Sequence, residues 1–239
     1  MVRVSDAIRD RLIVALDTDA HTALGLAQSL RGHVSWLKVG MTLYYSEGPE
    51  VVRRFADLGF RVFVDLKLHD IPHQVEGAAR EIARTGAGML TVHASGGRAM
   101  MEAAVRGACE ASQECGLSTP DVLAVTVLTS MDEAALKDVG VLRSASEHVE
   151  LLGTLARASG VQGVVCSPHE AAAMRDLLGS EALVVTPGVR IAGTDSDDQA
   201  RVATPGEALA AGASHVVVGR PITGAANPAA AVETIFPEE

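Results

Sequence analysis

The length, composition and charge of this chain exclude several classes of protein. Its 239 residues are 48% hydrophobic and 21% charged, which supplies enough apolar material for a folded core and excludes a disordered chain. The formal net charge of −10 argues against a nucleic-acid-binding protein, because contact with a phosphate backbone needs a basic surface. No apolar run reaches the length of a membrane span, so we expect no membrane partner.

The N-terminal segment and the cysteines predict a cytoplasmic protein. Four charged residues interrupt the first apolar segment within residues 6–11, which is not typical of a signal peptide. The three cysteines, Cys109, Cys115 and Cys166, lack the spacing of metal ligands, and an odd number fits reduced thiols. We therefore expect a cytoplasmic location.

Eight short apolar runs alternate with helix-like segments along the chain. The runs begin at Leu12, Trp36, Val62, Met89, Val122, Gly163, Leu183 and His215. They are nearly continuous rather than alternating, which is typical of parallel strands covered on both faces. The segments between them, such as VEGAAREIARTGAG, have the apolar spacing of helices and end in Gly or Ser.

This alternation predicts an α/β fold, a (β/α)8 TIM barrel that forms a single domain over residues 1–239. The alternative is a doubly wound open sheet. A dinucleotide-binding sheet of that kind carries G-x-G-x-x-G after its first strand, whereas Asp17 and no glycine cluster follow the first run here. We therefore favour the barrel.

Polar residues at the ends of the apolar runs are candidates for a site, because a barrel builds its active site from the C-terminal ends of its strands. They are Asp17, Lys38, Asp65, Lys67, His93, Thr129, Arg190 and Arg220. Asp65 and Lys67 are two residues apart, which on a regular strand places both side chains on one face, roughly 6.6 Å apart along it. With Lys38 and Asp70 they make an alternating array of ammoniums and carboxylates that can stabilise a carbanion and deliver a proton.

Each of these acidic residues has a plainer interpretation. Asp17 can cap the helix that follows it. Asp65, Lys67 and Asp70 can form an ion-pair network that only closes the mouth of the barrel. Asp17, Asp65 and Asp70 are also suitable ligands for Mg²⁺, but the lysines between them repel a divalent cation, so we expect no metal.

The histidines near the array carry weaker signals. We expect structural roles for His69 and His73, which flank Asp70 in the sequence. For His93 two interpretations stay open, a hydrogen bond that braces the barrel mouth and a catalytic task.

A second cluster lies near the C-terminus and predicts a phosphate site. Arg190 follows the seventh run, and Gly219 and Arg220 follow the eighth. Loops after strands seven and eight of this fold frequently hold a phosphate through backbone N–H groups and a guanidinium. The alternative is an ordinary turn and a surface arginine. The polar segment 191–205 predicts a loop that closes over the phosphate, with Gln199 among its contacts.

These residues stand in motifs that resemble those of the orotidine 5′-phosphate decarboxylase family, bacterial type, over essentially the whole chain. The motifs are LDTD, LKVGMTLYYSEGP, VFVDLKLHDIPHQV, VHASGG, VTVLTS, VTPGVR and VVVGRPIT, in this order. The D-x-K-x-x-D element is shared with sugar-phosphate decarboxylases and aldolase-like synthases of the same superfamily. Lys38 discriminates, because those relatives tend to carry an acid at that position.

The resemblance implies an enzyme, a carboxy-lyase that converts orotidine 5′-monophosphate to uridine 5′-monophosphate and CO₂ in the last step of de novo UMP synthesis. It implies no cofactor and a homodimer with shared active sites. Lys67 matches the proton donor to C6, Asp65 the carboxylate beside the substrate carboxylate, and Lys38 and Asp70 the rest of the array, Asp70 acting across the dimer interface. The implied substrate contacts also include Asp17, Ile71, Thr129, Ser130, Arg190, Gln199, Gly219 and Arg220.

Two other functions remain open on the residues alone. One is a metal-dependent keto-sugar-phosphate decarboxylase or synthase on the same barrel, which would need Mg²⁺. The other is a non-enzymatic protein that binds a phosphate ligand, and this reading leaves the Lys38, Asp65, Lys67 and Asp70 array unexplained.

Overall fold

Eight parallel strands form a closed barrel in the computed structural model, which describes residues 9–189 and 203–235. The strands pair in chain order, and the last pairs with the first. They are β1 (Leu12–Ala15), β2 (Trp36–Gly40), β3 (Arg61–Leu68), β4 (Met89–His93), β5 (Asp121–Val125), β6 (Gly163–Val165), β7 (Leu183–Thr186) and β8 (His215–Val218). The predicted TIM barrel is confirmed, and the open doubly wound sheet is wrong.

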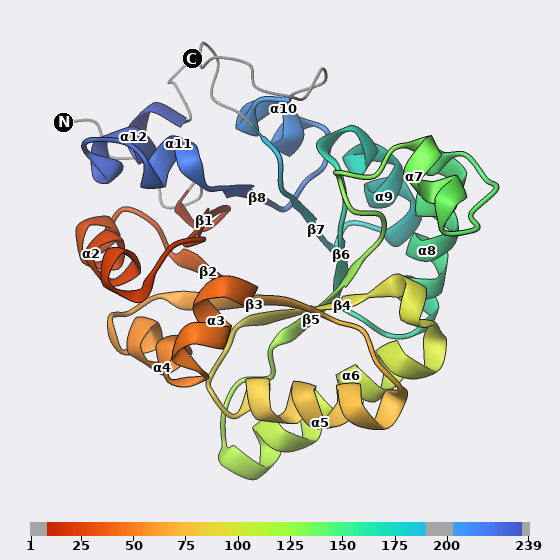
Figure 1. The fold of residues 1–239 in the computed structure, drawn as a ribbon, viewed down its shortest axis with the longest axis horizontal. Coiled ribbons are helices and arrows are strands. Elements are labelled where there is room, and N and C mark those ends of the chain that lie inside the picture. The colour runs from red at the N-terminus through yellow and green to blue at the C-terminus, as the bar shows by residue number, and fades with distance from the viewer. Residues whose placement is uncertain (1–8, 190–202, 236–239) are drawn as a thin grey trace.

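Helical segments connect the strands and surround the barrel (Figure 1). They are α2 (Ala20–Leu30), α3 (Met41–Glu47), α4 (Glu50–Asp57), α5 (Pro72–Ala83), α6 (Arg98–Cys115), α7 (Glu133–Asp138), α8 (Ala145–Ala158), α9 (Ala171–Leu178), α10 (Pro205–Ala210), α11 (Arg220–Thr223) and α12 (Pro228–Ile235), with short 3₁₀ turns η1 (Ala94–Gly96) and η2 (Pro168–Glu170). In the described part of the chain, no helix is long and apolar enough to cross a membrane.

Alternate residues of each strand face two different apolar layers. Ile13, Phe63 and Val125 belong to a cluster inside the barrel, whereas Val14 and Val64 pack in the larger cluster that includes the buried helix residues. Because both faces of every strand are covered, the strands read as continuous apolar runs rather than as an alternating pattern. The barrel interior is therefore a packed core with room for a site only near its ends.

Aromatic and charged side chains lie together where β2, β3 and β8 begin. The rings of Trp36 and His215 meet edge to face with centroids 5.9 Å apart, and the Arg61 guanidinium lies 4.5 Å from the Trp36 ring centroid. Burial, with the nearby guanidiniums of Arg61 and Arg11, lowers the pKa of His215 to about 4. This group occupies the N-terminal end of the barrel, opposite the end where a site is expected.

The segment expected to be a loop up to residue 205 ends earlier. Helix α10 begins at Pro205, and Thr204 caps it: the Thr204 hydroxyl accepts from the backbone N–H of Glu207, and the Glu207 carboxylate accepts from that of Thr204. The pattern Thr-Pro-x-Glu is a capping box with proline in the first turn, a local signal for a helix start. The rest of the expected loop, residues 191–202, lies outside the described residues.

Candidate active site

A cavity of about 660 Å³ opens at the C-terminal ends of the strands. Its apolar walls come from the inner barrel residues Phe63, Val125, Val165 and Val217, together with Leu128. Four charged residues that lie together, Asp17, Lys38, Asp65 and Lys67, also line it, and the ionisable residues Cys166 and Arg220 line other parts of it. Charged groups beside the apolar walls of a cavity interact more strongly than they do in water, so their arrangement determines what the cavity can do.

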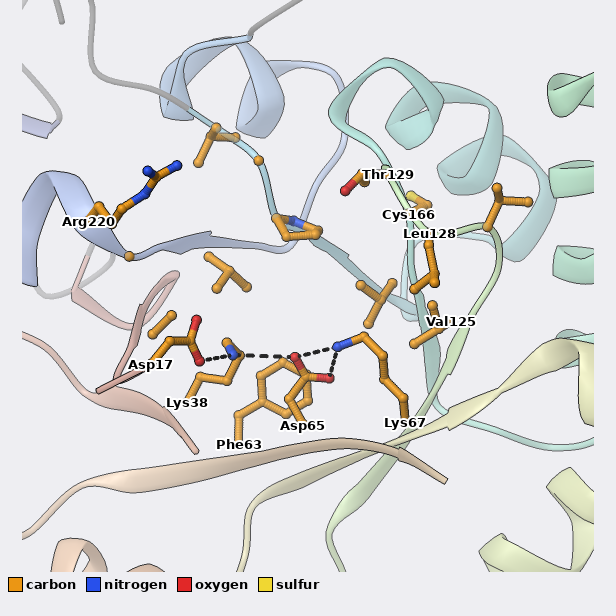
Figure 2. A pocket seen from close by; sticks show the side chains of 18 of the residues that line it. Asp17, Lys38, Phe63, Asp65, Lys67, Val125, Leu128, Thr129, Cys166 and Arg220 are labelled. Atoms are coloured by element: carbon orange, nitrogen blue, oxygen red, sulfur yellow. Dashed lines mark hydrogen bonds and ion pairs between the residues drawn. The ribbon is translucent and has the colours of Figure 1, made fainter. Parts of the chain in front are cut away.

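The four charged groups stand in one row along one side of the cavity, as Figure 2 shows. The Lys38 ammonium lies 3.0 Å from an Asp17 carboxylate oxygen and 3.5 Å from an Asp65 oxygen. The Lys67 ammonium lies 2.9 Å from each oxygen of the Asp65 carboxylate. The predicted meeting of Lys38, Asp65 and Lys67 therefore occurs within one chain, with Asp17 as the second carboxylate of the row.

Lys38 is more deeply placed than the sequence suggests. It stands in the middle of β2 rather than near the strand end, and only 10% of its side chain is exposed. A buried ammonium has to be paired, and here carboxylates lie on two sides of it.

Lys67 departs from regular strand geometry. Its φ is +52°, the only positive φ among the described non-glycine residues, in the left-handed region that costs such a residue on the order of 1–3 kcal/mol. The register between β3 and β4 shifts here, because Val64 pairs with Leu90 whereas Leu68 pairs with Val92. Three residues of β3 therefore stand opposite Thr91, and the expected regular spacing of Asp65 and Lys67 is wrong. The irregularity brings their charged groups into direct contact.

Thr91 belongs to this site although it is not among the residues predicted from the sequence. Its hydroxyl donates to an Asp65 carboxylate oxygen at 3.0 Å and accepts from the Lys67 backbone N–H at 2.9 Å. The available signal is a single hydroxyl in the apolar run MLTV, two residues before His93 and hence on the same strand face. That signal does not reveal that the Thr91 hydroxyl bonds to Asp65 and Lys67 on the neighbouring strand.

Asp65 is held as a carboxylate by its neighbours. Burial raises the pKa of its carboxyl group, but the ammoniums of Lys38 and Lys67 and the hydrogen bonds from Lys67 and Thr91 lower it more, so the pKa lies below its ordinary value. The Asp65 side chain is 12% exposed, so this negative charge has little contact with solvent.

Asp17 does not cap the helix that follows β1. The cap of α2 is Asp19, whose carboxylate accepts from the Thr22 backbone N–H at 3.0 Å. Asp17 is thereby left to pair with Lys38, and its side chain is 63% exposed at the cavity edge. The plainer interpretation of Asp17 is wrong.

Three predicted site residues stand apart from the cavity of their own chain. Of the described residues, Asp70, Ile71 and Ser130 are not among those that line it. The Asp70 carboxylate accepts from the Ile71 backbone N–H at 2.6 Å, and both side chains are exposed. Within one chain, Asp70 is therefore not part of the charged row.

The expected phosphate side of the cavity is described in part. Gly219 and Arg220 line it, together with Pro187 and Gly188 after β7. Thr129 lines the cavity as well, and Figure 2 places it across the cavity from Arg220, with the charged row on a third side. Arg190 and Gln199 lie outside the described residues.

The three histidines have different surroundings. The rings of His69 and His93 lie 5.3 Å apart, and burial, with the neighbouring His69 and Lys67, lowers the pKa of His93. Within residues 9–189 and 203–235, His93 makes no hydrogen bond, so the brace, one of its two open interpretations, is not observed. His73 is exposed at the start of α5, and within the described residues it makes no hydrogen bond, ion pair or ring contact that would support the structural role that we expected.

The described residues contain no group of three or more His, Cys, Asp or Glu side chains placed to hold a metal ion. In the charged row each carboxylate is bonded to an ammonium. Such a row can stabilise a developing anion at one end through Lys67 and can place a carboxylate against an anionic substrate group through Asp65. An ammonium of this row can also deliver a proton to a carbon atom of a substrate without the help of a cofactor.

Comparison with known proteins gives one consistent result. The family model described as "Orotidine 5′-phosphate decarboxylase / HUMPS family" matches residues 10–235. A curated orotidine 5′-phosphate decarboxylase from Moorella thermoacetica is 47% identical over 232 residues, covering 96% of this chain and 92% of that protein. One from Anaeromyxobacter sp. (strain K) is 51% identical over 227 residues, covering 95% and 96%.

A solved structure leads to the same family. The crystal structure of orotidine 5′-phosphate decarboxylase from Lactobacillus acidophilus superimposes with a TM-score of 0.84 at 38% identity, covering 95% of this chain and 97% of that one. The likeness extends over the barrel and the sequence together, and the resemblance seen in the sequence motifs is confirmed. The chain belongs to the orotidine 5′-phosphate decarboxylase / HUMPS family.

Proposed function

We propose that this chain is a carboxy-lyase that converts orotidine 5′-monophosphate to uridine 5′-monophosphate and CO₂, the last step of de novo UMP synthesis. The observation that carries the proposal is the Asp65–Lys67 pair, with both carboxylate oxygens 2.9 Å from the ammonium in a cavity that has apolar walls. The family and its curated relatives, which carry this activity in their names, support the same reaction.

The reaction needs an ammonium at the carbon that loses CO₂. When the bond between C6 and the substrate carboxylate breaks, the electron pair stays on C6. The Lys67 ammonium stabilises that charge and then transfers its proton to C6, which leaves a neutral amine that solvent protonates again. No cofactor or metal takes part in these steps.

Asp65 and Lys38 prepare the site for this step. Asp65 holds Lys67 in place through both of its oxygens and stands where the substrate carboxylate is to be released, so the departure of CO₂ relieves a repulsion between two anions. Lys38 balances the negative charges of Asp65 and Asp17, which limits their repulsion of an anionic substrate.

Contacts remote from C6 supply binding energy that orders the site. We assign the substrate contacts to Asp17, Lys38, Asp65, Lys67, Thr129, Ser130, Arg190, Gln199, Gly219 and Arg220, and to Asp70 and Ile71 of a second subunit. Gly219 and Arg220 border the cavity where a phosphate is expected in this fold. A phosphate held there uses binding energy away from the reacting carbon to position C6 at Lys67.

We propose that the active enzyme is a homodimer in which Asp70 completes the partner's array. Asp70 is exposed and does not line its own cavity, although its sequence position is next to the array. Exposed apolar side chains follow the neighbouring strands β2 and β3 at the same end of the barrel, with Met41 48%, Tyr45 74% and Ile71 63% exposed. A second copy that covers these residues buries them and brings its own Asp70 along. In this proposal residues 1–239 form one catalytic domain, located in the cytoplasm.

The test is turnover of orotidine 5′-monophosphate by metal-free protein in the presence of a chelator. The loss of orotate absorbance measures this turnover. We expect turnover that added Mg²⁺ does not increase. A keto-sugar-phosphate decarboxylase or synthase would instead need Mg²⁺ and would not consume orotidine 5′-monophosphate. The contact of Lys38 with Asp17 and Asp65 disfavours that second function, because an ammonium occupies the place between the carboxylates where a divalent cation would bind.

A further inference from the structure

Thr91 connects the two reacting residues of β3 from the neighbouring strand. It is 0% exposed, in the middle of β4, and its hydroxyl contacts both the Asp65 carboxylate and the Lys67 backbone. A buried hydroxyl has one proton to donate, and here that proton goes to Asp65. The oxygen is then free to accept the N–H of Lys67, so the two hydrogen bonds orient one another.

The bulge in β3 explains why a hydroxyl is needed at this place. Between the pairs Val64–Leu90 and Leu68–Val92, β3 has two more residues than β4, so the backbone N–H of Lys67 has no regular ladder partner. Lys67 also has the left-handed φ of +52°. An N–H left without a partner inside the barrel would favour a return to regular strand geometry, and the Thr91 oxygen at 2.9 Å satisfies it instead.

We propose that Thr91 is a positioning residue for the decarboxylation, one that holds the Lys67 backbone in its left-handed conformation and the Asp65 carboxylate against the Lys67 ammonium. The proposal rests on the proposed function, since it concerns the geometry of the same reaction. Thr91 does not line the cavity among the described residues, so it acts through Asp65 and Lys67 and not on the substrate.

The groups that face Asp65 define what a change at Thr91 does to its charge. They are Lys38 from β2, Lys67 from β3, and Thr91 and His93 from β4, with Asp17 bonded to Lys38 behind them. Burial raises the pKa of Asp65, and the two ammoniums and then the Thr91 hydroxyl lower it. Loss of the hydroxyl therefore moves the pKa of Asp65 upward, while the two lysines still keep the carboxylate ionised at neutral pH.

The experiment compares three variants with wild type in the metal-free decarboxylation assay. Thr91→Val keeps the shape and removes the hydroxyl, and the pair Thr91→Ser and Thr91→Ala differ from each other by one oxygen atom. We expect Thr91→Val and Thr91→Ala to lower kcat by about 10- to 100-fold, because the reacting groups lose their alignment. KM should change little, because the substrate keeps its contacts. Thr91→Ser should stay within about threefold of wild type, because it keeps the hydroxyl.

The pH dependence of kcat distinguishes a positioning role of Thr91 from a role in packing alone. In Thr91→Val the acid limb of the profile should move to higher pH, since Asp65 takes up a proton more readily, and in Thr91→Ser it should stay at the wild-type position. Equal losses of kcat in Thr91→Ser and Thr91→Ala, or a Thr91→Val profile unchanged from wild type, would overturn the proposal. If Thr91→Val does not fold, the Ser and Ala pair decides by the same comparison. Failure of wild type to consume orotidine 5′-monophosphate is a different result, since it contradicts the proposed function itself.

Discussion

The ammonium of Lys67 lies 2.9 Å from both carboxylate oxygens of Asp65, although only one residue separates the two in the chain. On a regular strand their side chains would stand roughly 6.6 Å apart along the strand direction. The bulge at Lys67 departs from that regular geometry, and the ammonium that we propose as the proton donor lies against a carboxylate. The relative position of the Asp65 and Lys67 side chains therefore depends on the backbone conformation as well as on the residue types.

Replacement of Lys67 by alanine should abolish the reaction. Lys67→Ala removes both the charge that stabilises the carbanion and the proton that C6 needs, so kcat should fall by more than about 10³-fold. Loss of orotate absorbance at saturating substrate measures it. Lys137→Ala, at an exposed lysine on α7, is the matched control and should behave as wild type. Unchanged turnover in Lys67→Ala would show that another group protonates C6.

Mixed dimers test the shared site. Lys67→Ala and Asp70→Ala subunits should each be inactive alone, but a hybrid dimer contains one site with both residues intact. After full exchange of equal amounts, half of the dimers are hybrids, and activity should return to about a quarter of the wild-type value. Native mass spectrometry of subunits with different tags verifies the exchange. Absence of recovery after verified exchange would mean that Asp70 does not act in the partner's site.

Gly40 leaves room for the pairing of Asp17 with Lys38. A Cβ atom at Gly40 would stand 2.7 Å from an Asp17 carboxylate oxygen and 3.2 Å from the Lys38 ammonium, and the Gly40 φ of −87° suits alanine. Gly40→Ala should therefore displace the exposed Asp17 side chain without unfolding the barrel, and should lower kcat/KM by about tenfold.

A second glycine supplies the control for that change. Gly25 lies in α2, and a Cβ atom there would meet nothing within 4 Å. Gly25→Ala should leave kcat/KM at the wild-type value and raise the free energy of unfolding by up to about 1 kcal/mol, as expected in a helix interior. A Gly40→Ala enzyme that is as active as wild type would show that the Asp17–Lys38 contact is dispensable.

His215 should make stability depend on pH. Its pKa is about 4 in the folded protein, first because it is buried and then because Arg61 and Arg11 are near, whereas an unfolded histidine has a pKa of about 6.5. Between these two values the unfolded chain binds a proton that the folded chain does not. The free energy of unfolding should therefore fall as pH drops from about 6.5 to about 4, by roughly 3 kcal/mol from this residue.

Urea unfolding across this pH range measures the effect. In His215→Gln the decrease between about pH 6.5 and pH 4 should be smaller than in wild type by that amount, whatever the change in absolute stability. His21→Gln, at an exposed histidine in α2, should leave the wild-type slope unchanged. Parallel curves for wild type and His215→Gln would show that His215 is protonated in the folded protein as easily as in the unfolded one.

The local pattern of the sequence by itself determined the barrel and most of the charged row. The runs predicted at Leu12, Trp36 and Met89 begin β1, β2 and β4 at those residues, because hydrophobic periodicity and chain breaks are local properties. Lys38, Asp65 and Lys67 follow from the same pattern, since parallel strands of a barrel bring their C-terminal ends together.

Tertiary structure alone decided how these groups meet. The bulge at Lys67 depends on the register between β3 and β4, and Thr91 reaches its partners from 24 and 26 residues away in the sequence. A period of two along one strand carries no information about the two extra residues of β3 or about the hydroxyl on the next strand. The sequence therefore predicts which charges form the row, whereas the strand register and the Thr91 hydrogen bonds exist only in the closed barrel.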